Sequence, residues 1–206
     1  MAEHVLDYDR ASVRQETGYW CGPASIQTVL IAAGIAVAER DIAAQTEALE
    51  GNQGDDRDGT DSITQVTTVL NRYGAGGYVT RLMPDDPPTP AQIDQLWNDI
   101  RASIDAGRGL VANIVAPPSN YPRGVRGSTS PAYGGGTVWH YFALMGYSDD
   151  EAIWVADSGF APYGYWISLG QLATLIPPKG YACAPLGRPD TSVWDEIATQ
   201  MMGPRS

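Results

Sequence analysis

The stretch QETGYWCGPAS, residues 15–25, carries the strongest structural and chemical signal in this chain. Cys21 follows an aromatic residue and precedes a Gly-Pro pair, and the apolar run from Ser25 to Ala33 predicts a helix that begins near the cysteine. Backbone N–H groups and the positive end of a helix dipole favour the thiolate, which is the reactive form of cysteine. The stretch therefore predicts that Cys21 is a nucleophile.

Three other residues supply the groups that such a nucleophile needs. His140 lies in an apolar, strand-like run, and Asp157 ends the next such run, residues 152–157. The imidazole can accept the thiol proton, and the carboxylate can hold that ring in one tautomer. The amide of Gln15, six positions before the cysteine, could stabilise an oxyanion, and losing such a donor typically costs about 2.7–4 kcal/mol. The four residues together predict a cysteine acyl-transfer site.

Composition excludes several other classes of function. A length of 206 residues predicts one domain that buries roughly 70% of its unfolded surface. The net charge of −11 and the absence of a Lys/Arg run argue against nucleic-acid binding and against attraction to an anionic membrane. Two cysteines make no disulfide framework, and no Cys/His cluster has metal-ligand spacing, so we expect neither a metal nor a cofactor. Cys183, in a short apolar run, is expected to be a buried structural thiol.

Helical patterns come first along the chain and strand patterns follow, which predicts an α+β fold with N-terminal helices packed on a C-terminal antiparallel sheet. Asp61 is expected to cap the third helix. The expected helices span 21–34, 37–49, 61–74, 89–106 and 168–175, and the expected strands span 78–83, 109–115, 138–147, 152–157, 163–167 and 181–184. We expect a domain over 1–188, with 189–206 a linker or C-terminal tail that could lead to a further domain.

Substrate contacts are expected next to the two reactive groups and in one long loop. Trp20 precedes the nucleophile and Trp139 precedes the base. The glycine-rich loop 117–136 enters the His140 strand and is the expected substrate lid, because long loops without secondary structure are often functional. The residues assigned to substrate binding are Trp20, Trp139, Asn120, Tyr121 and Tyr133.

The acidic stretch 55–61 has the look of half a calcium loop. A full EF-hand loop that starts at Asp56 needs a bidentate Glu at its twelfth position, and Thr67 stands there. The EF-hand interpretation therefore fails, and a solvated acidic turn is expected, although cation binding is left open.

The motifs around Gln15, Cys21, His140 and Asp157 resemble those of papain-like peptidases of the double-glycine leader type. That family carries a Gln, a Cys-Gly-Pro-Ala helix start, a His strand followed by Gly-Tyr, and an Asp after the next strand. The resemblance implies a papain-like fold in which Cys21 is the nucleophile, His140 the base, Asp157 its orienter and Gln15 the oxyanion donor. One departure is that Ser158 follows the aspartate, where leader peptidases usually have proline.

A closer resemblance is to the N-terminal peptidase modules of mycobacteriophage endolysins, with the segment 194–204 similar to the junction where those modules end. This resemblance implies an endopeptidase that cuts the peptide stems or cross-links of peptidoglycan, linked to a lytic or wall-binding domain. It also implies a protein held in the host cytoplasm before lysis and acting afterwards at the cell wall. The sequence shows neither a signal-peptide pattern nor about 18 consecutive apolar residues, so no membrane insertion is expected.

Three alternatives stay open at this point. The chain could be the leader-peptide-processing peptidase of a bacteriocin exporter. It could be a catalytically inactive papain-like module that only binds wall peptides, although an intact Cys/His/Asp/Gln set argues against this. An acyl transferase that uses the same covalent intermediate would form new amide bonds.

Overall fold

Five α-helices and a seven-stranded sheet form the part of the chain that the computed structural model describes, residues 2–50 and 59–185. The helices are α1 (Cys21–Ala32), α2 (Glu39–Glu50), α3 (Ile63–Leu70), α4 (Pro90–Asp105) and α5 (Leu169–Leu175). The strands are β1 (Glu3–Val5), β2 (Val79–Leu82), β3 (Leu110–Ala116), β4 (Val138–Ser148), β5 (Ala152–Ala156), β6 (Gly164–Ser168) and β7 (Gly180–Cys183). Short helical turns are η1 (Arg10–Ser12), η2 (Asn71–Ala75) and η3 (Pro118–Asn120).

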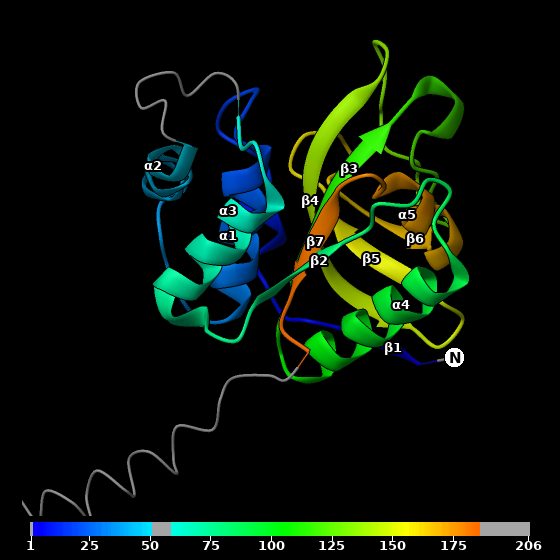
Figure 1. The fold of residues 1–206 in the computed structure, drawn as a ribbon, viewed down its shortest axis with the longest axis horizontal. Coiled ribbons are helices and arrows are strands. Elements are labelled where there is room, and N and C mark those ends of the chain that lie inside the picture. Colours follow the sequence, from blue (N-terminus) through cyan, green and yellow to red (C-terminus); the bar gives the residue numbers. More distant parts are fainter. Residues whose placement is uncertain (1, 51–58, 186–206) are drawn as a thin grey trace, which may run out of the picture.

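The sheet is antiparallel throughout and has the order β2-β7-β3-β4-β5-β6, with β1 paired to the end of β4. Helices α1, α2 and α3 lie on one side of this sheet, and α4 and α5 lie on the other (Figure 1). The predicted α+β fold, with N-terminal helices packed on an antiparallel sheet, is confirmed. The sheet also carries a second layer of helices on its other face.

Alternation along β4 accounts for the two cores. Tyr141, Ala143 and Met145 pack with the buried side chains of α1 and α3 in one apolar cluster. Phe142 and Leu144, which alternate with them, pack with α4 and α5 in the other. Successive side chains of a strand point to opposite faces, so an almost wholly apolar strand is what a sheet covered on both faces requires.

The start of α3 differs from the sequence prediction, which placed its cap at Asp61. Ser62 is the cap instead: its Oγ accepts from the backbone N–H of Thr64 at 3.2 Å. The Gln65 side chain returns to the Ser62 N–H at 2.8 Å, which completes a capping box. The prediction was wrong because this reciprocal pair satisfies two backbone donors, whereas an aspartate one position earlier has no such partner. The predicted tail 189–206 and most of the acidic stretch 55–61 lie outside the described residues.

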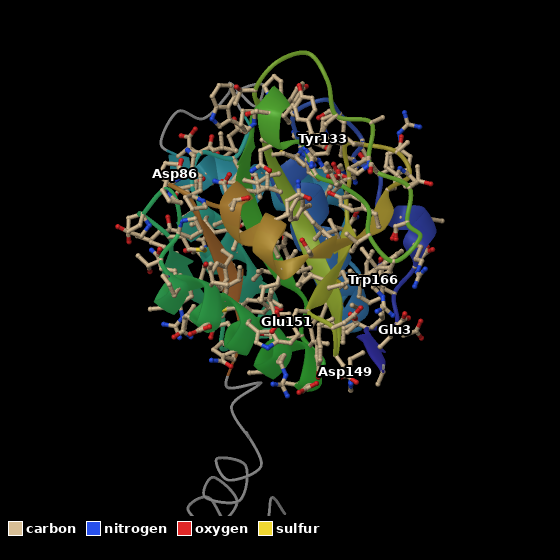
Figure 2. All side chains as sticks on the ribbon, turned by 90° about the vertical axis from the view of Figure 1, so that its right-hand side faces the viewer. Glu3, Asp86, Tyr133, Asp149, Glu151 and Trp166 are labelled. Carbon is tan, nitrogen blue, oxygen red and sulfur yellow. The ribbon has the colours of Figure 1, made fainter. Side chains whose placement is uncertain are left out.

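The loop between β3 and β4 is fastened along β6. Val125 N–H donates to the Trp166 carbonyl at 2.8 Å, and Trp166 N–H donates to the Ser128 hydroxyl at 3.0 Å. Arg126 pairs with both Glu3 and Asp150. Tyr133, further along the same loop, lies towards the end of the molecule opposite Trp166 and Glu3 (Figure 2). The loop therefore reaches from the β1 side of the sheet to the end where β4 begins.

Candidate active site

Cys21 is the first residue of α1 and is partly exposed. The backbone N–H groups of Gly22 and Tyr141 favour its thiolate form and help to lower its pKa. The following glycine is required by packing, because a Cβ at Gly22 would lie 2.4 Å from Thr60 Oγ1. The helix begins at Cys21, as the sequence predicted.

His140 lies on β4, between Cys21 and Asp157. Its Nε2 lies 2.9 Å from Asp157 Oδ1, and both side chains are buried. The Cys21 thiol interacts with the same ring, which favours its thiolate form. Because Nε2 is used by Asp157, Nδ1 is the ring nitrogen left for Cys21. The structure therefore brings Cys21, His140 and Asp157 together as a catalytic triad, with His140 between the other two.

The charges and hydrogen bonds of this triad favour an ion pair between the Cys21 thiolate and the His140 imidazolium. Burial opposes ionisation of the thiol, but the hydrogen bond and charge of His140 outweigh burial and lower the pKa of Cys21 below its ordinary value of 9.0. Burial likewise favours the neutral ring, but the charge and hydrogen bond of Asp157 outweigh it and raise the pKa of His140 to about 10. Between these two pKa values the pair exists as thiolate and imidazolium, the state from which a cysteine nucleophile attacks.

Asp157 is fully buried, and five donors hold its carboxylate. Besides the ring of His140, they are the backbone N–H groups of Gly159 and Phe160 on Oδ1 and the hydroxyls of Tyr133 and Tyr165 on Oδ2, at 3.0–3.2 Å. Burial and the neighbouring Asp157 raise the pKa of both tyrosines well above 10, so both stay protonated donors. These bonds fix the carboxylate and disperse its charge.

Sequence reasoning missed the part that the two tyrosines play. Tyr165 shares an alternating pattern with Ile167 on β6, which marks an inward-facing position but gives no hint of its partner. Tyr133 was assigned to substrate binding. The structure instead stacks its ring on Phe160 with centroids 3.9 Å apart and places its hydroxyl on Asp157.

Gln15 is held beside the triad by its own segment and by the turn that follows β5. Its Nε2 donates to the Thr17 carbonyl at 2.6 Å, and its Oε1 accepts from the Ser158 hydroxyl at 3.0 Å. The Gln15 backbone N–H also donates to the Ser158 carbonyl at 3.1 Å, and the buried Glu39 carboxylate accepts from Glu16 N–H at 3.1 Å. One amide proton of Gln15 is left to donate. Serine after Asp157, where leader peptidases usually have proline, thus supplies a hydroxyl that orients this amide.

Two hollows meet at the reactive groups. One, of about 440 Å³, extends over Gln15, Gly159 and Phe160, and the other, of about 340 Å³, extends over Asn113 and Lys179. Both are lined by the same four residues at their junction: Gly18, Cys21, Trp139 and His140. An extended chain could therefore continue on both sides of Cys21.

The remaining predicted substrate contacts are distributed unevenly. The Trp139 side chain is 66% exposed and lines both hollows. Trp20 lines a separate small pocket with Thr60, and its indole N–H has no partner among residues 2–50 and 59–185. The structure does not bring Asn120 and Tyr121 to either hollow. Asn120 donates to Thr174 at 3.0 Å, and the Tyr121 hydroxyl donates to the carbonyl of a loop glycine, Gly136, at 2.6 Å.

The second cysteine has the character expected of a structural thiol. Cys183 is buried on β7, forms no disulfide, and its thiol donates to the Val79 carbonyl at 3.9 Å. Burial first, and then the charge of Asp99, raise the pKa of this thiol, so it stays protonated. The two thiols of the chain therefore differ in the direction of their pKa shifts, which makes Cys183 an internal reference for the reactivity of Cys21.

The described residues offer no site for a metal ion and no membrane span. No group of three or more His, Cys, Asp or Glu side chains in residues 2–50 and 59–185 could hold a metal ion. In the same residues no helix is both long enough and apolar enough to cross a bilayer.

Several solved structures are similar to this chain. Among solved structures, a double glycine motif protease from an AMS/PCAT transporter in complex with its leader peptide is 13% identical, covers 86% of this chain and 91% of its own, and has a TM-score of 0.48. The peptidase domain of Streptococcus ComA, a bifunctional ABC transporter involved in quorum sensing, is 15% identical, with coverages of 84% and 96% and a TM-score of 0.48. A clostridial cysteine protease, Cwp84, is 16% identical, with coverages of 87% and 55% and a TM-score of 0.44. At these values the likenesses assign no activity to this chain.

The sequence comparison is more decisive. No curated protein matches the chain. The family model described as "Peptidase_C39 like family" matches residues 7–173, a span that contains Gln15, Cys21, His140 and Asp157. A cysteine thiol at a helix start, hydrogen-bonded to a histidine that a buried aspartate holds, is the catalytic arrangement of a cysteine peptidase. The chain therefore belongs to the Peptidase_C39 like family.

Proposed function

We propose that this protein is a cysteine endopeptidase that cuts an extended peptide segment through an acyl-enzyme. The observation that carries the proposal is the position of the Cys21–His140 pair at the junction of two open hollows. A peptide that fills both hollows presents an internal bond to the thiolate, whereas an exopeptidase site would be closed on one side.

The proposed reaction begins with attack of the Cys21 thiolate on the scissile carbonyl carbon. The resulting oxyanion accepts from the Cys21 backbone N–H and from the free amide proton of Gln15. The His140 imidazolium then gives its proton to the departing amine, which leaves a thioester on Cys21 and a neutral imidazole. A water molecule attacks the thioester as His140 takes its proton, and the cleaved peptide leaves as a carboxylic acid while the ion pair is restored.

For the substrate we propose a leader-type peptide, cut within a short extended segment. Membership of the Peptidase_C39 like family supports this choice. The solved double glycine motif protease is in complex with its leader peptide, and this supplies the substrate class to be tested.

A second candidate is the peptide stem or cross-link of mycobacterial peptidoglycan, cut by this chain as part of a phage endolysin. It is favoured by the sequence resemblance around Cys21 and by the similarity of residues 194–204 to an endolysin junction. This second candidate implies a linked lytic or wall-binding domain and an enzyme that acts at the cell wall after lysis. Both candidates use the same proposed chemistry, so substrate alone distinguishes them.

The test is digestion of both substrates by the wild type and by Cys21→Ala. End-blocked peptides that contain a central Gly-Gly pair and purified mycobacterial peptidoglycan are incubated separately, and new termini are identified by mass spectrometry. We expect new termini in the peptide set that are absent with Cys21→Ala. New termini only in peptidoglycan would show that the substrate is the peptidoglycan peptide and not a leader-type peptide. Sedimentation with peptidoglycan without any cleavage would favour an inactive binding module, and new amide bonds would indicate an acyl transferase.

A further inference from the structure

The hollow of about 340 Å³ beside Cys21, named here the Lys179 hollow, is rich in hydrogen-bond donors. Its polar lining comes from Thr60, Asp61, Asn113, Tyr141 and Lys179, which are brought together from the segment before α3, from β3 and β4, and from the turn before β7. The hydrogen bonds and ion pairs that these side chains already make determine which donor groups remain free for a ligand.

Lys179 is the only lysine among the 206 residues, and the other twelve of the 13 basic Lys/Arg residues are arginines. Its backbone is fixed on both sides, because its N–H donates to the Ile176 carbonyl at 2.8 Å and its carbonyl accepts from Met83 N–H at 2.9 Å. Its side chain is partly exposed, and no carboxylate in residues 2–50 and 59–185 forms an ion pair with it. Lys179 therefore lines the hollow from a fixed backbone position, with no ion-pair partner among the described residues.

Tyr141 and Thr60 add two hydroxyl donors. Asn113 stands opposite Tyr141 in the β3–β4 register and donates to its hydroxyl oxygen at 2.8 Å, so the Tyr141 proton remains to be donated. Burial, together with the negative charges of Cys21 and Asp61, raises the pKa of Tyr141 and keeps that proton in place. Thr60 is 8% exposed, and its hydroxyl has no partner among the described residues. Buried polar groups without a partner are costly, so a bound acceptor would relieve this one.

We propose that the Lys179 hollow is a substrate subsite that binds a carboxylate close to the scissile bond, with Lys179 as its cation and the Tyr141 and Thr60 hydroxyls as further donors. This inference rests on the proposed peptidase function, because the hollow opens onto Cys21 and His140. Asp61 also lines the hollow, is exposed, and makes no ion pair with Lys179. It repels a carboxylate and so confines the favourable region to the Lys179 end.

The carboxylate can come from two sources: an acidic side chain within a peptide, or the free carboxyl end of a short peptide. A degenerate hexapeptide library separates them when it is prepared with blocked ends and, in parallel, with a free C-terminus. Each library is digested by the wild type, Lys179→Gln, Lys179→Glu, Asp61→Asn and the control Arg101→Gln, and the residues flanking each cut are counted by mass spectrometry. Arg101 is an exposed residue of α4 whose ring contacts are with Trp97 and Tyr147.

We expect the wild type and Arg101→Gln to prefer a carboxylate over its amide counterpart at one flanking position by about tenfold, as for a charge-assisted hydrogen bond at a partly exposed site. Lys179→Gln should abolish the preference, Lys179→Glu should reverse it, and Asp61→Asn should strengthen it. Preference in the blocked library identifies a side chain, and preference only in the free library identifies a peptide end. Cleavage without such a preference, or a preference that survives Lys179→Gln, would overturn the subsite while leaving the peptidase function intact.

If no library peptide is cut by any variant, the proposed function fails on those substrates, and the subsite is tested without cleavage. The rates at which iodoacetate and iodoacetamide alkylate Cys21 are compared, because only the first reagent carries a carboxylate. Lys179→Gln should lower the iodoacetate-to-iodoacetamide rate ratio several-fold relative to Arg101→Gln. An unchanged ratio would reject Lys179 as the cation of this site.

Discussion

Gly159→Ala is the substitution that most sharply tests the geometry of the triad. Gly159 follows Asp157 by two residues and is exposed, and its backbone N–H binds the Asp157 carboxylate. A Cβ built there would lie 2.9 Å from Cε1 of His140 and 3.3 Å from Oε1 of Gln15. The substitution therefore presses on the base and on the proposed oxyanion donor together.

The expected loss of activity follows from how far these two distances fall below ordinary van der Waals contact. Ordinary van der Waals contact begins near 3.4 Å, so the His140 ring must move by about 0.5 Å to accept the new methyl group. Misplacement of a catalytic group by 1 Å costs about 100-fold in rate, so a movement of about half that size should cost about tenfold. We expect kcat/KM for peptide cleavage to fall about tenfold, and the rate of Cys21 alkylation by iodoacetamide to fall with it.

The matched control is Gly170→Ala in α5, where a Cβ would meet no atom within 4 Å. This change should leave kcat/KM unaltered and leave the free energy of unfolding equal or higher by about 0.5–1 kcal/mol. Thermal melting of both variants shows whether they are folded. A folded Gly159→Ala variant with the kcat/KM and alkylation rate of the wild type would refute the placement of His140 and Gln15 around this glycine.

Three further predictions concern the ionisation and support of the site. Peptide cleavage should need the Cys21 thiolate together with the His140 imidazolium. A plot of kcat/KM against pH should therefore rise at a pH below 9.0, the ordinary thiol pKa, and fall near pH 10, where His140 loses its proton. A single rise in kcat/KM that continues beyond pH 10 would contradict the ion pair. Tyr133→Phe keeps the ring stacking but removes one of the five donors to Asp157, so kcat should fall roughly three- to tenfold while the melting temperature changes little; an unchanged kcat would show that this hydroxyl does not position the carboxylate. Cys183→Ala should lower the free energy of unfolding by about 1 kcal/mol through lost packing and leave kcat unchanged, and a large loss of kcat in a folded variant would contradict its structural role.

The sequence predicted best the features whose causes are local. Helix α4 was placed within one residue at each end, because Thr89 and Pro90 form a start signal and an apolar stripe continues from Ile93. The apolar run 109–115 likewise predicted β3, which is buried on both faces. The cap of α3 was misplaced by one residue because Asp61 and Ser62 are both acceptable caps, and only the return bond from Gln65 distinguishes them.

The site was predictable only in its reactive groups. Cys21, His140 and Asp157 stand out because their chemistry contrasts with apolar neighbours in helix and strand patterns. The hydroxyl of Tyr133 reaches Asp157 across 24 residues from a loop with no periodicity, so no local pattern could assign that bond. Lys179 is equally remote in sequence, and its place in the hollow depends on how β7 follows α5.

The central claim, that His140 activates Cys21 and that Cys183 is inert, is tested most directly by alkylation at pH 6. Wild type and His140→Ala are treated with iodoacetamide, and the rate at each cysteine is followed by peptide mass spectrometry, with Cys183 as the reference in the same molecule. We predict that Cys21 in the wild type is alkylated on the order of 100-fold faster than Cys183, because His140 lowers the pKa of Cys21 whereas burial raises the pKa of Cys183, and that His140→Ala removes most of this advantage. Equal, slow alkylation of the two cysteines in the wild type would contradict the account.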